Sequence, residues 1–174
     1  SKLCPVAIVF TPIFFAANSI PRLRNGPQIE QEVIFLFSLL SKTLSNVNPN
    51  SSLNDIFTCS IHCSNNFPVR KTKSDLDVEL DDNLDSHQYL KILNQTLEKC
   101  LNLFNPELVL YDAGVDIHLN DELGKLKVDD IGLLQRDETV LQFFKDLSIP
   151  IATVIGGGYS KNKIELAKRH ASVF

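Results

Sequence analysis

Apolar residues recur in short runs from residue 55 onward, and turn-forming residues separate these runs. Runs of this length that are rich in β-branched and other apolar side chains are typical of buried strands. We therefore predict strands at residues 55–62, 76–80, 106–114 and 149–155. Glycine stands at the exit of the last two strands, as Gly114 and Gly156.

Helical spacing of apolar residues fills the intervals between these strands. In residues 85–104, apolar side chains recur every three or four positions after an N-cap at Asp85 or Ser86. A second helix is predicted over residues 129–147, and a last helix begins near Lys161. The predicted apolar faces are Tyr89, Leu90, Leu93, Leu97, Leu101 and Phe104 on the first helix, and Leu133, Leu134, Val140, Leu141 and Phe144 on the second.

This alternation of strands and helices is typical of an α/β fold with a mainly parallel sheet flanked by helices. In such folds, ligands gather at the carboxyl ends of the strands. We predict that two loops meet on this rim, one after the strand at 106–114 and one after the strand at 149–155. The first loop carries Asp112, Asp116 and His118, and the second carries Gly156, Gly157, Gly158 and Tyr159.

The first 55 residues follow a different pattern, and we predict an irregular or disordered segment here, before a domain at residues 56–174. Residues 3–17 are apolar, like the core of a signal peptide, but their short length and two prolines equally favour a buried strand. A second apolar run occupies residues 33–40. The chain begins with Ser1 and contains no methionine, so we expect a fragment or processed product of a longer chain.

Composition excludes several classes of function. With 174 residues, of which 44% are hydrophobic, the chain is long enough for one globular domain with a core. The net charge of -4, without a basic stripe, predicts no direct nucleic-acid binding, and we predict no membrane span. The four cysteines are irregularly spaced, which favours a reducing, intracellular location in the nucleus or cytoplasm.

Several candidate residues have an ordinary structural interpretation beside a functional one. Cys59, His62 and Cys63 form half of a zinc pattern, but the second pair of ligands is missing, which favours a buried strand. The glycine run does not have the spacing of a phosphate loop. By itself, Asp116 is a loop carboxylate that caps a turn, and Tyr159 is a packing tyrosine. For His87, His118 and His170, solvent-exposed or structural roles are expected.

Five motifs in order resemble a known family. FTCSIHCSNNFP, SDLDVEL, LVLYDAGVDIHLNDELGKLKV, GLLQRD and IPIATVIGGGYS are similar to the second half of a zinc-dependent histone deacetylase, nearest to the class IV and bacterial-like branch. The resemblance runs from about Ile56 to His170. It implies an arginase/deacetylase-like fold, apparently incomplete in this chain, and the hydrolysis of acetyl-lysine or a related acyl amide.

The resemblance also implies roles for individual residues. Asp116 stands where the family has the last of its three zinc ligands. Tyr159 stands at the position of the tyrosine that hydrogen-bonds the acyl carbonyl and then the oxyanion. The three glycines then let the backbone approach a bound acyl chain and present this tyrosine to the metal. The remaining implied positions are Phe67, Gly157 and Gly158 in the substrate channel, and Ser60 and Ile61 at a monovalent cation.

The chain departs from the family before the strand that contains Phe57. Residues 1–61 contain no histidine and only one aspartate, Asp55. The family needs a His-His pair as general base and acid, and an Asp-x-His pair as two of the zinc ligands, in this part of the chain. A catalytic zinc site normally has three protein ligands. We therefore predict that zinc is not retained and that the chain is inactive alone.

Three functional hypotheses remain. The chain is a partial deacetylase that would act on an acetylated protein or a small acetylated amine, or it is a deacetylase-fold protein without catalysis that binds a regulatory partner. An uncovered edge of the sheet would be the surface for such a partner. The third hypothesis is an unrelated α/β ligand-binding domain.

Overall fold

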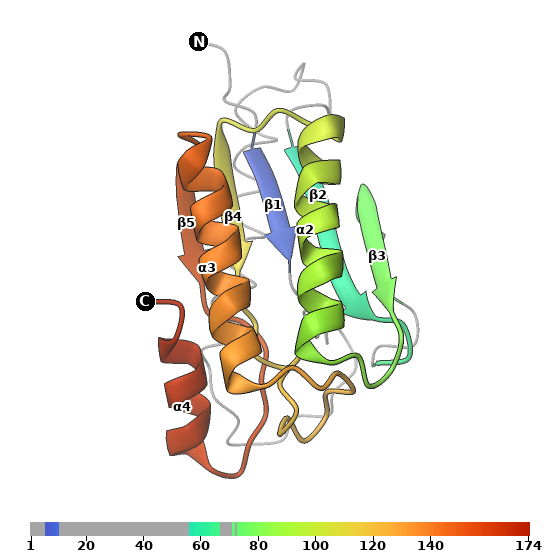
Figure 1. Ribbon diagram of the computed structural model, residues 1–174, viewed down its shortest axis with the longest axis vertical. Coiled ribbons are helices and arrows are strands. Elements are labelled where there is room, and N and C mark those ends of the chain that lie inside the picture. The colour runs from blue at the N-terminus through green and yellow to red at the C-terminus, as the bar shows by residue number, and fades with distance from the viewer. Residues whose placement is uncertain (1–5, 11–55, 67–70, 72) are drawn as a thin grey trace, which may run out of the picture.

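The strands form one parallel sheet in the computed structural model, which describes residues 6–10, 56–66, 71 and 73–174. Within this part of the chain, the order of the five strands is β3-β2-β1-β4-β5, and every neighbouring pair is parallel (Figure 1). The strands are β1 (Val6–Phe10), β2 (Ile56–Cys63), β3 (Leu76–Leu80), β4 (Leu108–Asp112) and β5 (Ile151–Val154). The predicted α/β fold with a parallel sheet is therefore confirmed.

Strand β1 comes from the apolar segment at residues 3–17 and lies at the centre of the sheet. Its Phe10 is aligned with Ser60 of β2 on one side and with Asp112 of β4 on the other. A central strand has hydrogen-bonding partners for its backbone on both sides. Of the two interpretations of this segment, the strand is the one that the structure shows at residues 6–10.

Other expectations fall on residues that the structure does not describe. These are most of the first 55 residues, including the apolar run at 33–40, and the predicted channel residue Phe67. The division of the chain at residue 55 therefore stays a prediction. Among the described residues, no helix has the length and apolar character needed to cross a membrane.

Helices α2 (Ser86–Leu103) and α3 (Asp130–Asp146) lie side by side on one face of the sheet (Figure 1). Both begin near the carboxyl ends of the strands, where their N-caps are joined. Ser86 Oγ donates to Asp129 Oδ1 at 2.8 Å, and Asp129 in turn caps α3 by accepting from the Gly132 N–H. Asp85 caps α2, as its sequence position predicted. Helix α4 (Lys163–Ala171) follows β5.

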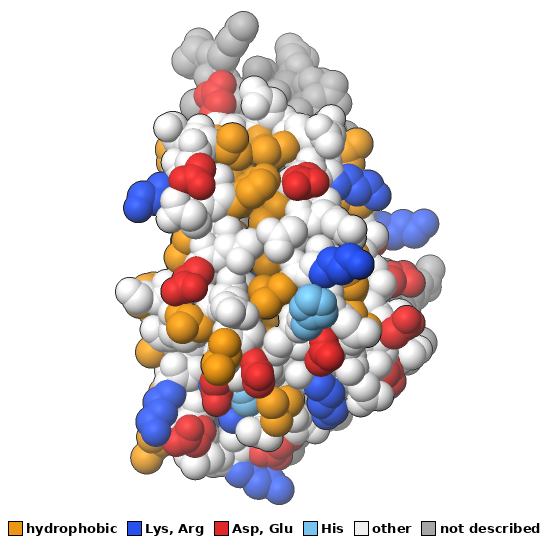
Figure 2. All heavy atoms as spheres, viewed as in Figure 1, with side chains coloured by type: hydrophobic (Ala, Val, Ile, Leu, Met, Phe, Trp, Pro, Cys, Tyr) orange, Lys and Arg blue, Asp and Glu red, His pale blue; other side chains and the backbone are white. Residues whose placement is uncertain are grey.

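The core lies between the sheet and the two helices. The buried helical residues include Tyr89, Leu93 and Leu97 of α2, and Leu133, Val140 and Phe144 of α3. Leu134 was expected on the apolar face of α3 but is 43% exposed. The buried stripe of α3 instead contains the charged residues Arg136 and Asp137. On the outer surface of this layer, acidic and basic side chains are interspersed (Figure 2).

Candidate functional site

Two loops lie side by side at the carboxyl end of the sheet. One loop follows β4 and runs through residues 113–128, and the other follows β5 and runs through residues 155–162. The Ala113 N–H donates to the Val154 carbonyl at 2.9 Å, and the Val115 N–H donates to the Gly157 carbonyl at 2.8 Å. The prediction that these loops share one rim is confirmed, because parallel strands end on the same side of their sheet.

Asp116 is a buried carboxylate without an ion pair among the described residues. Its side chain is 1% exposed, and neither of its oxygens accepts a hydrogen bond from another described residue. The Gly157 backbone packs against it, since a Cβ at that position would lie 3.0 Å from Asp116 Cγ. Burial, followed by the negative charges of Asp121 and Asp112, raises the pKa of Asp116 well above its usual range. The ionised form of this group therefore needs a cation.

Asp112, at the end of β4, is a second buried carboxylate on the same rim. Burial raises its pKa to about 7, although Arg136 opposes this shift. Gly156 lies directly against it, and a side chain at position 156 would overlap the Asp112 carboxylate. The backbone at position 156 approaches the Asp112 carboxylate so closely that only glycine fits there.

Tyr159 stands at the end of the glycine run, with its side chain 40% exposed. Its backbone N–H donates to Asp121 Oδ2 at 2.6 Å, and its carbonyl accepts from the Glu122 N–H at 3.3 Å. The preceding Gly158 has φ of +143°, a conformation that residues with a Cβ rarely adopt. The loop after β4 thus anchors the backbone of Tyr159, and Gly158 provides the turn before it.

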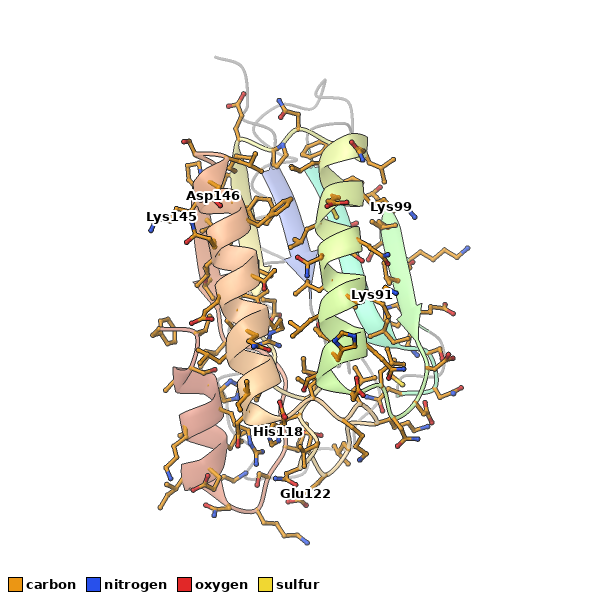
Figure 3. The ribbon with its side chains drawn as sticks, in the orientation of Figure 1. Lys91, Lys99, His118, Glu122, Lys145 and Asp146 are labelled. Atoms are coloured by element: carbon orange, nitrogen blue, oxygen red, sulfur yellow. The ribbon has the colours of Figure 1, made fainter. Side chains whose placement is uncertain are left out.

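His118 is buried, so the solvent-exposed interpretation of this residue is wrong. Nδ1 accepts a hydrogen bond from the Asn120 N–H at 3.1 Å, and Nε2 lies 3.1 Å from Asp130 Oδ1. Burial, with a smaller contribution from Arg169, lowers the pKa of His118, and Asp130 opposes this shift. The contact between Nε2 and Asp130 places His118 between the loop and the start of α3 (Figure 3). The loop that the sequence indicated as polar is thereby partly buried.

Arg136 braces the loop that carries Asp116, and the sequence analysis assigned it no role. It is fully buried, its Nε donates to Asp137 Oδ1 at 2.8 Å, and its guanidinium also donates to the carbonyls of Ala113 and Gly114. The Tyr111 hydroxyl donates to the same Asp137 oxygen at 2.6 Å. The signal that could have found this pair is the presence of two charged residues within the apolar stripe of α3.

The buried-strand interpretation of the half-zinc pattern is confirmed, since Cys59 and Cys63 are buried in β2. Successive side chains of a strand point to opposite faces, so Cys59 and Cys63 point into the core while His62 does not. His62 Nδ1 instead lies 2.9 Å from Ser60 Oγ. Within residues 6–10, 56–66, 71 and 73–174, no three His, Cys, Asp or Glu side chains come together as a metal site. Nothing tests the cation role of Ser60 and Ile61, which stays a prediction.

Two solved structures share this arrangement of strands and helices. An acetylpolyamine aminohydrolase from Burkholderia pseudomallei aligns with 98% of this chain and 44% of its own length, with a TM-score of 0.64 and 16% identity. An HDAC homolog from Aquifex aeolicus aligns with 96% of this chain and 40% of its own length, with a TM-score of 0.61 and 16% identity. These likenesses show the arginase/deacetylase fold.

Sequence comparison identifies the family. The histone deacetylase domain matches residues 48–173. An uncharacterized protein of Picosynechococcus sp. is 48% identical over 116 residues, which are 67% of this chain and 39% of that protein. Histone deacetylase 2 of Arabidopsis thaliana is 40% identical over 88 residues, which are 51% of this chain and 23% of that protein. The chain spans less than half the length of these relatives. By this match, it belongs to the histone deacetylase family.

Proposed function

We propose that this chain contributes Asp116 and Tyr159 to a zinc-dependent site that hydrolyses the amide of acetyl-lysine or of a small acetylated amine. The observation that carries the proposal is the buried Asp116 carboxylate, whose oxygens have no hydrogen-bond partner in another described residue. An Asp carboxylate is one of the side-chain groups that bind zinc, and the family is zinc-dependent. Zinc, when bound, activates a water molecule and polarises a carbonyl group.

The chain's own residues would bind and orient the acyl group. The exposed side chain of Tyr159 stands on the same rim as Asp116, so its hydroxyl would donate a hydrogen bond to the acyl oxygen. Gly157 lies directly against Asp116, and with Gly158 it would line the acyl channel. Phe67 would complete the channel wall, and Ser60 and Ile61 would hold a monovalent cation.

Asp116 fits one zinc ligand, and the described residues do not complete the ligand set. We propose that the 174 residues alone have no hydrolytic activity and do not retain zinc. Residues 1–61 contain no histidine and only Asp55 as an aspartate, so the His-His and Asp-x-His pairs of the family have no counterpart there. A single carboxylate binds zinc weakly. No observation on the described residues favours the alternative of a regulatory binding protein.

Two measurements on the purified chain test these statements. The first is zinc content together with hydrolysis of an acetyl-lysine peptide, with and without chelator. We expect substoichiometric zinc and no turnover, whereas stoichiometric zinc with chelator-sensitive turnover would overturn the proposed inactivity.

The second measurement is the shift in melting temperature at millimolar Zn²⁺ for the wild type, Asp116→Asn and Asp146→Asn. Asp146→Asn is the control, because it makes the same chemical change at the carboxyl end of α3, away from the loops of the site (Figure 3). We expect the zinc-dependent shift to decrease in Asp116→Asn and to stay unchanged in Asp146→Asn. An equal shift in all three proteins would show that Asp116 is not a zinc ligand.

A further inference from the structure

Asp121 connects the two loops of the candidate site through a single carboxylate. Its Oδ1 accepts hydrogen bonds from the Leu123 N–H at 2.9 Å and the Gly124 N–H at 2.6 Å, within its own loop. Its Oδ2 accepts from the Tyr159 N–H at 2.6 Å, across to the glycine run. Asp121 itself is buried. We call these three hydrogen bonds the Asp121 clamp.

The segment that the clamp holds is otherwise poor in side chains. Tyr159 follows Gly156, Gly157 and Gly158, which have no side chains to pack and lose more conformational freedom on folding than other residues. A short hydrogen bond to an ionised acceptor is stronger than one between neutral groups. The bond from the Tyr159 N–H therefore fixes the peptide from which the Tyr159 side chain extends.

Asp121 differs from the neighbouring acidic residue on the loop. Glu122 also reaches the glycine loop, but its Oε1 accepts from the Lys161 N–H, two residues beyond Tyr159. Glu122 is a surface side chain (Figure 3), whereas Asp121 is buried beneath the turn. The two carboxylates thus hold two different peptides of one loop, and each can be removed separately.

We propose that Asp121 is a positioning residue, which sets the direction of the Tyr159 side chain toward Asp116. This inference rests on the proposed function, because the direction of Tyr159 matters for acyl binding only if Tyr159 contacts the substrate. Asp121 itself touches neither substrate nor metal in this proposal. Its effect is transmitted through the Tyr159 peptide.

The substitution Asp121→Asn removes one bond of the clamp with little change in shape. The amide oxygen can still accept from the Leu123 and Gly124 N–H groups. The amide NH₂ group then faces the Tyr159 N–H, and two donors cannot form a hydrogen bond. Glu122→Gln is the matched control on the same loop, and Asp146→Asn is the control for the same chemical change far from the site.

The reporter is ¹⁹F NMR of the protein labelled with 3-fluorotyrosine. The chain has three tyrosines, Tyr89, Tyr111 and Tyr159, and Tyr159→Phe assigns the last. We expect Asp121→Asn to shift or broaden the Tyr159 resonance, while the resonances of the buried Tyr89 and Tyr111 stay in place. Both control variants should leave all three resonances in place. An unchanged Tyr159 resonance, or a change of all three, would overturn the positioning role.

Amide hydrogen exchange of the wild type and both loop variants provides the second reading. In the wild type, we expect the Tyr159 and Lys161 amides to be protected. Asp121→Asn should increase exchange at Tyr159 at least about tenfold and leave Lys161 unchanged. Glu122→Gln keeps an amide oxygen that can accept from the Lys161 N–H, so it should leave both amides protected. An unprotected Tyr159 amide in the wild type would overturn the clamp, even if Asp121→Asn did not fold. Neither measurement needs metal or substrate. A negative result in the zinc test would therefore refute the proposed function without deciding whether Asp121 positions Tyr159.

Discussion

Asp116 and Asp137 are equally buried, each at 1% exposure, but their surroundings differ. Asp137 forms an ion pair with Arg136 and accepts a hydrogen bond from the Tyr111 hydroxyl. Ser172 Oγ lies 3.4 Å from the other oxygen of Asp137. Asp116 receives no hydrogen bond from another described residue.

The comparison distinguishes a structural carboxylate from a candidate ligand. Burial of an ionised carboxylate costs several kcal/mol unless a cation and hydrogen-bond donors compensate for it. For Asp137, the fold itself provides both. For Asp116, no described residue forms an ion pair or donates a hydrogen bond to its side-chain oxygens, and Arg136 opposes the rise of its pKa only as a minor contribution. This difference is the physical basis for proposing Asp116 as a metal ligand.

The largest expected effect comes from breaking the structural pair. Arg136→Met leaves Asp137 buried without its cation and frees the carbonyls of Ala113 and Gly114. We expect the free energy of unfolding to fall by about 3–5 kcal/mol, measured by urea denaturation. Lys145→Met, an exposed cation on the same helix (Figure 3), should change it by less than about 0.5 kcal/mol. If both variants lowered the free energy of unfolding by similar amounts, Arg136 would not stabilise the fold through its ion pair with Asp137.

The pH dependence of stability should report the ionisation of the buried Asp112 carboxylate. The pKa of Asp112 rises from 3.8 to about 7 on folding, so the folded state favours its protonated form. The stabilisation is complete below pH 4 and is lost as the pH rises to about 7. In chelator, the free energy of unfolding should fall by a few kcal/mol over this range. Asp112→Asn should flatten the curve, and an unchanged slope would show that Asp112 ionises freely in the folded protein.

Asp116→Asn should stabilise the metal-free chain. The substitution replaces a buried carboxyl group, whose ionisation burial opposes, by a neutral amide of similar shape. We expect the free energy of unfolding to increase by about 1–3 kcal/mol in the presence of chelator. Asp146→Asn, at an exposed position, should stay within about 0.5 kcal/mol of the wild type. Destabilisation by Asp116→Asn would mean that a protein group compensates for its charge.

The smallest expected effect is at the exposed tyrosine of the site. Tyr159→Phe removes a hydroxyl from a side chain that is 40% exposed, and we expect it to change the free energy of unfolding by less than about 0.5 kcal/mol. Tyr111→Phe is the contrasting variant, because it removes a buried donor from Asp137. We expect that variant to cost about 1–3 kcal/mol. Both variants are compared by thermal denaturation. An equal loss of stability in the two would show that the Tyr111 hydroxyl contributes no more to the fold than the Tyr159 hydroxyl.

Most elements of the fold could be predicted because their signals are local. The spacing of apolar residues located α2, and Asp85 marked its first residue through a capping bond to Gln88. Strand β1 was ambiguous, since an apolar run flanked by prolines has no period that separates a strand from a signal-peptide core. Its place in the sheet depends on pairing with β2 and β4, which are far away in the sequence.

The candidate site was predicted only in part. Asp116 and Tyr159 were found through their motifs, and their assigned roles stay proposals. Asp121 and Arg136 were missed, because their partners are distant in the sequence. The hydrogen bond from Tyr159 to Asp121 spans 38 positions, and that from Arg136 to the Gly114 carbonyl spans 22. Patterns of neighbouring residues in the sequence do not reveal contacts over such distances along the chain.

The sequence by itself determined the strands and helices from residue 55 onward, about where the helices begin, and that two loops follow neighbouring strands at one rim. Periodicity and capping act between residues that are close along the chain, so these features are readable from one sequence. Only the tertiary structure decided which buried charges are compensated. Asp137 and Asp116 are the same residue type, and what separates them is that Arg136 forms an ion pair with Asp137, whereas the Asp116 oxygens accept no hydrogen bond from another described residue.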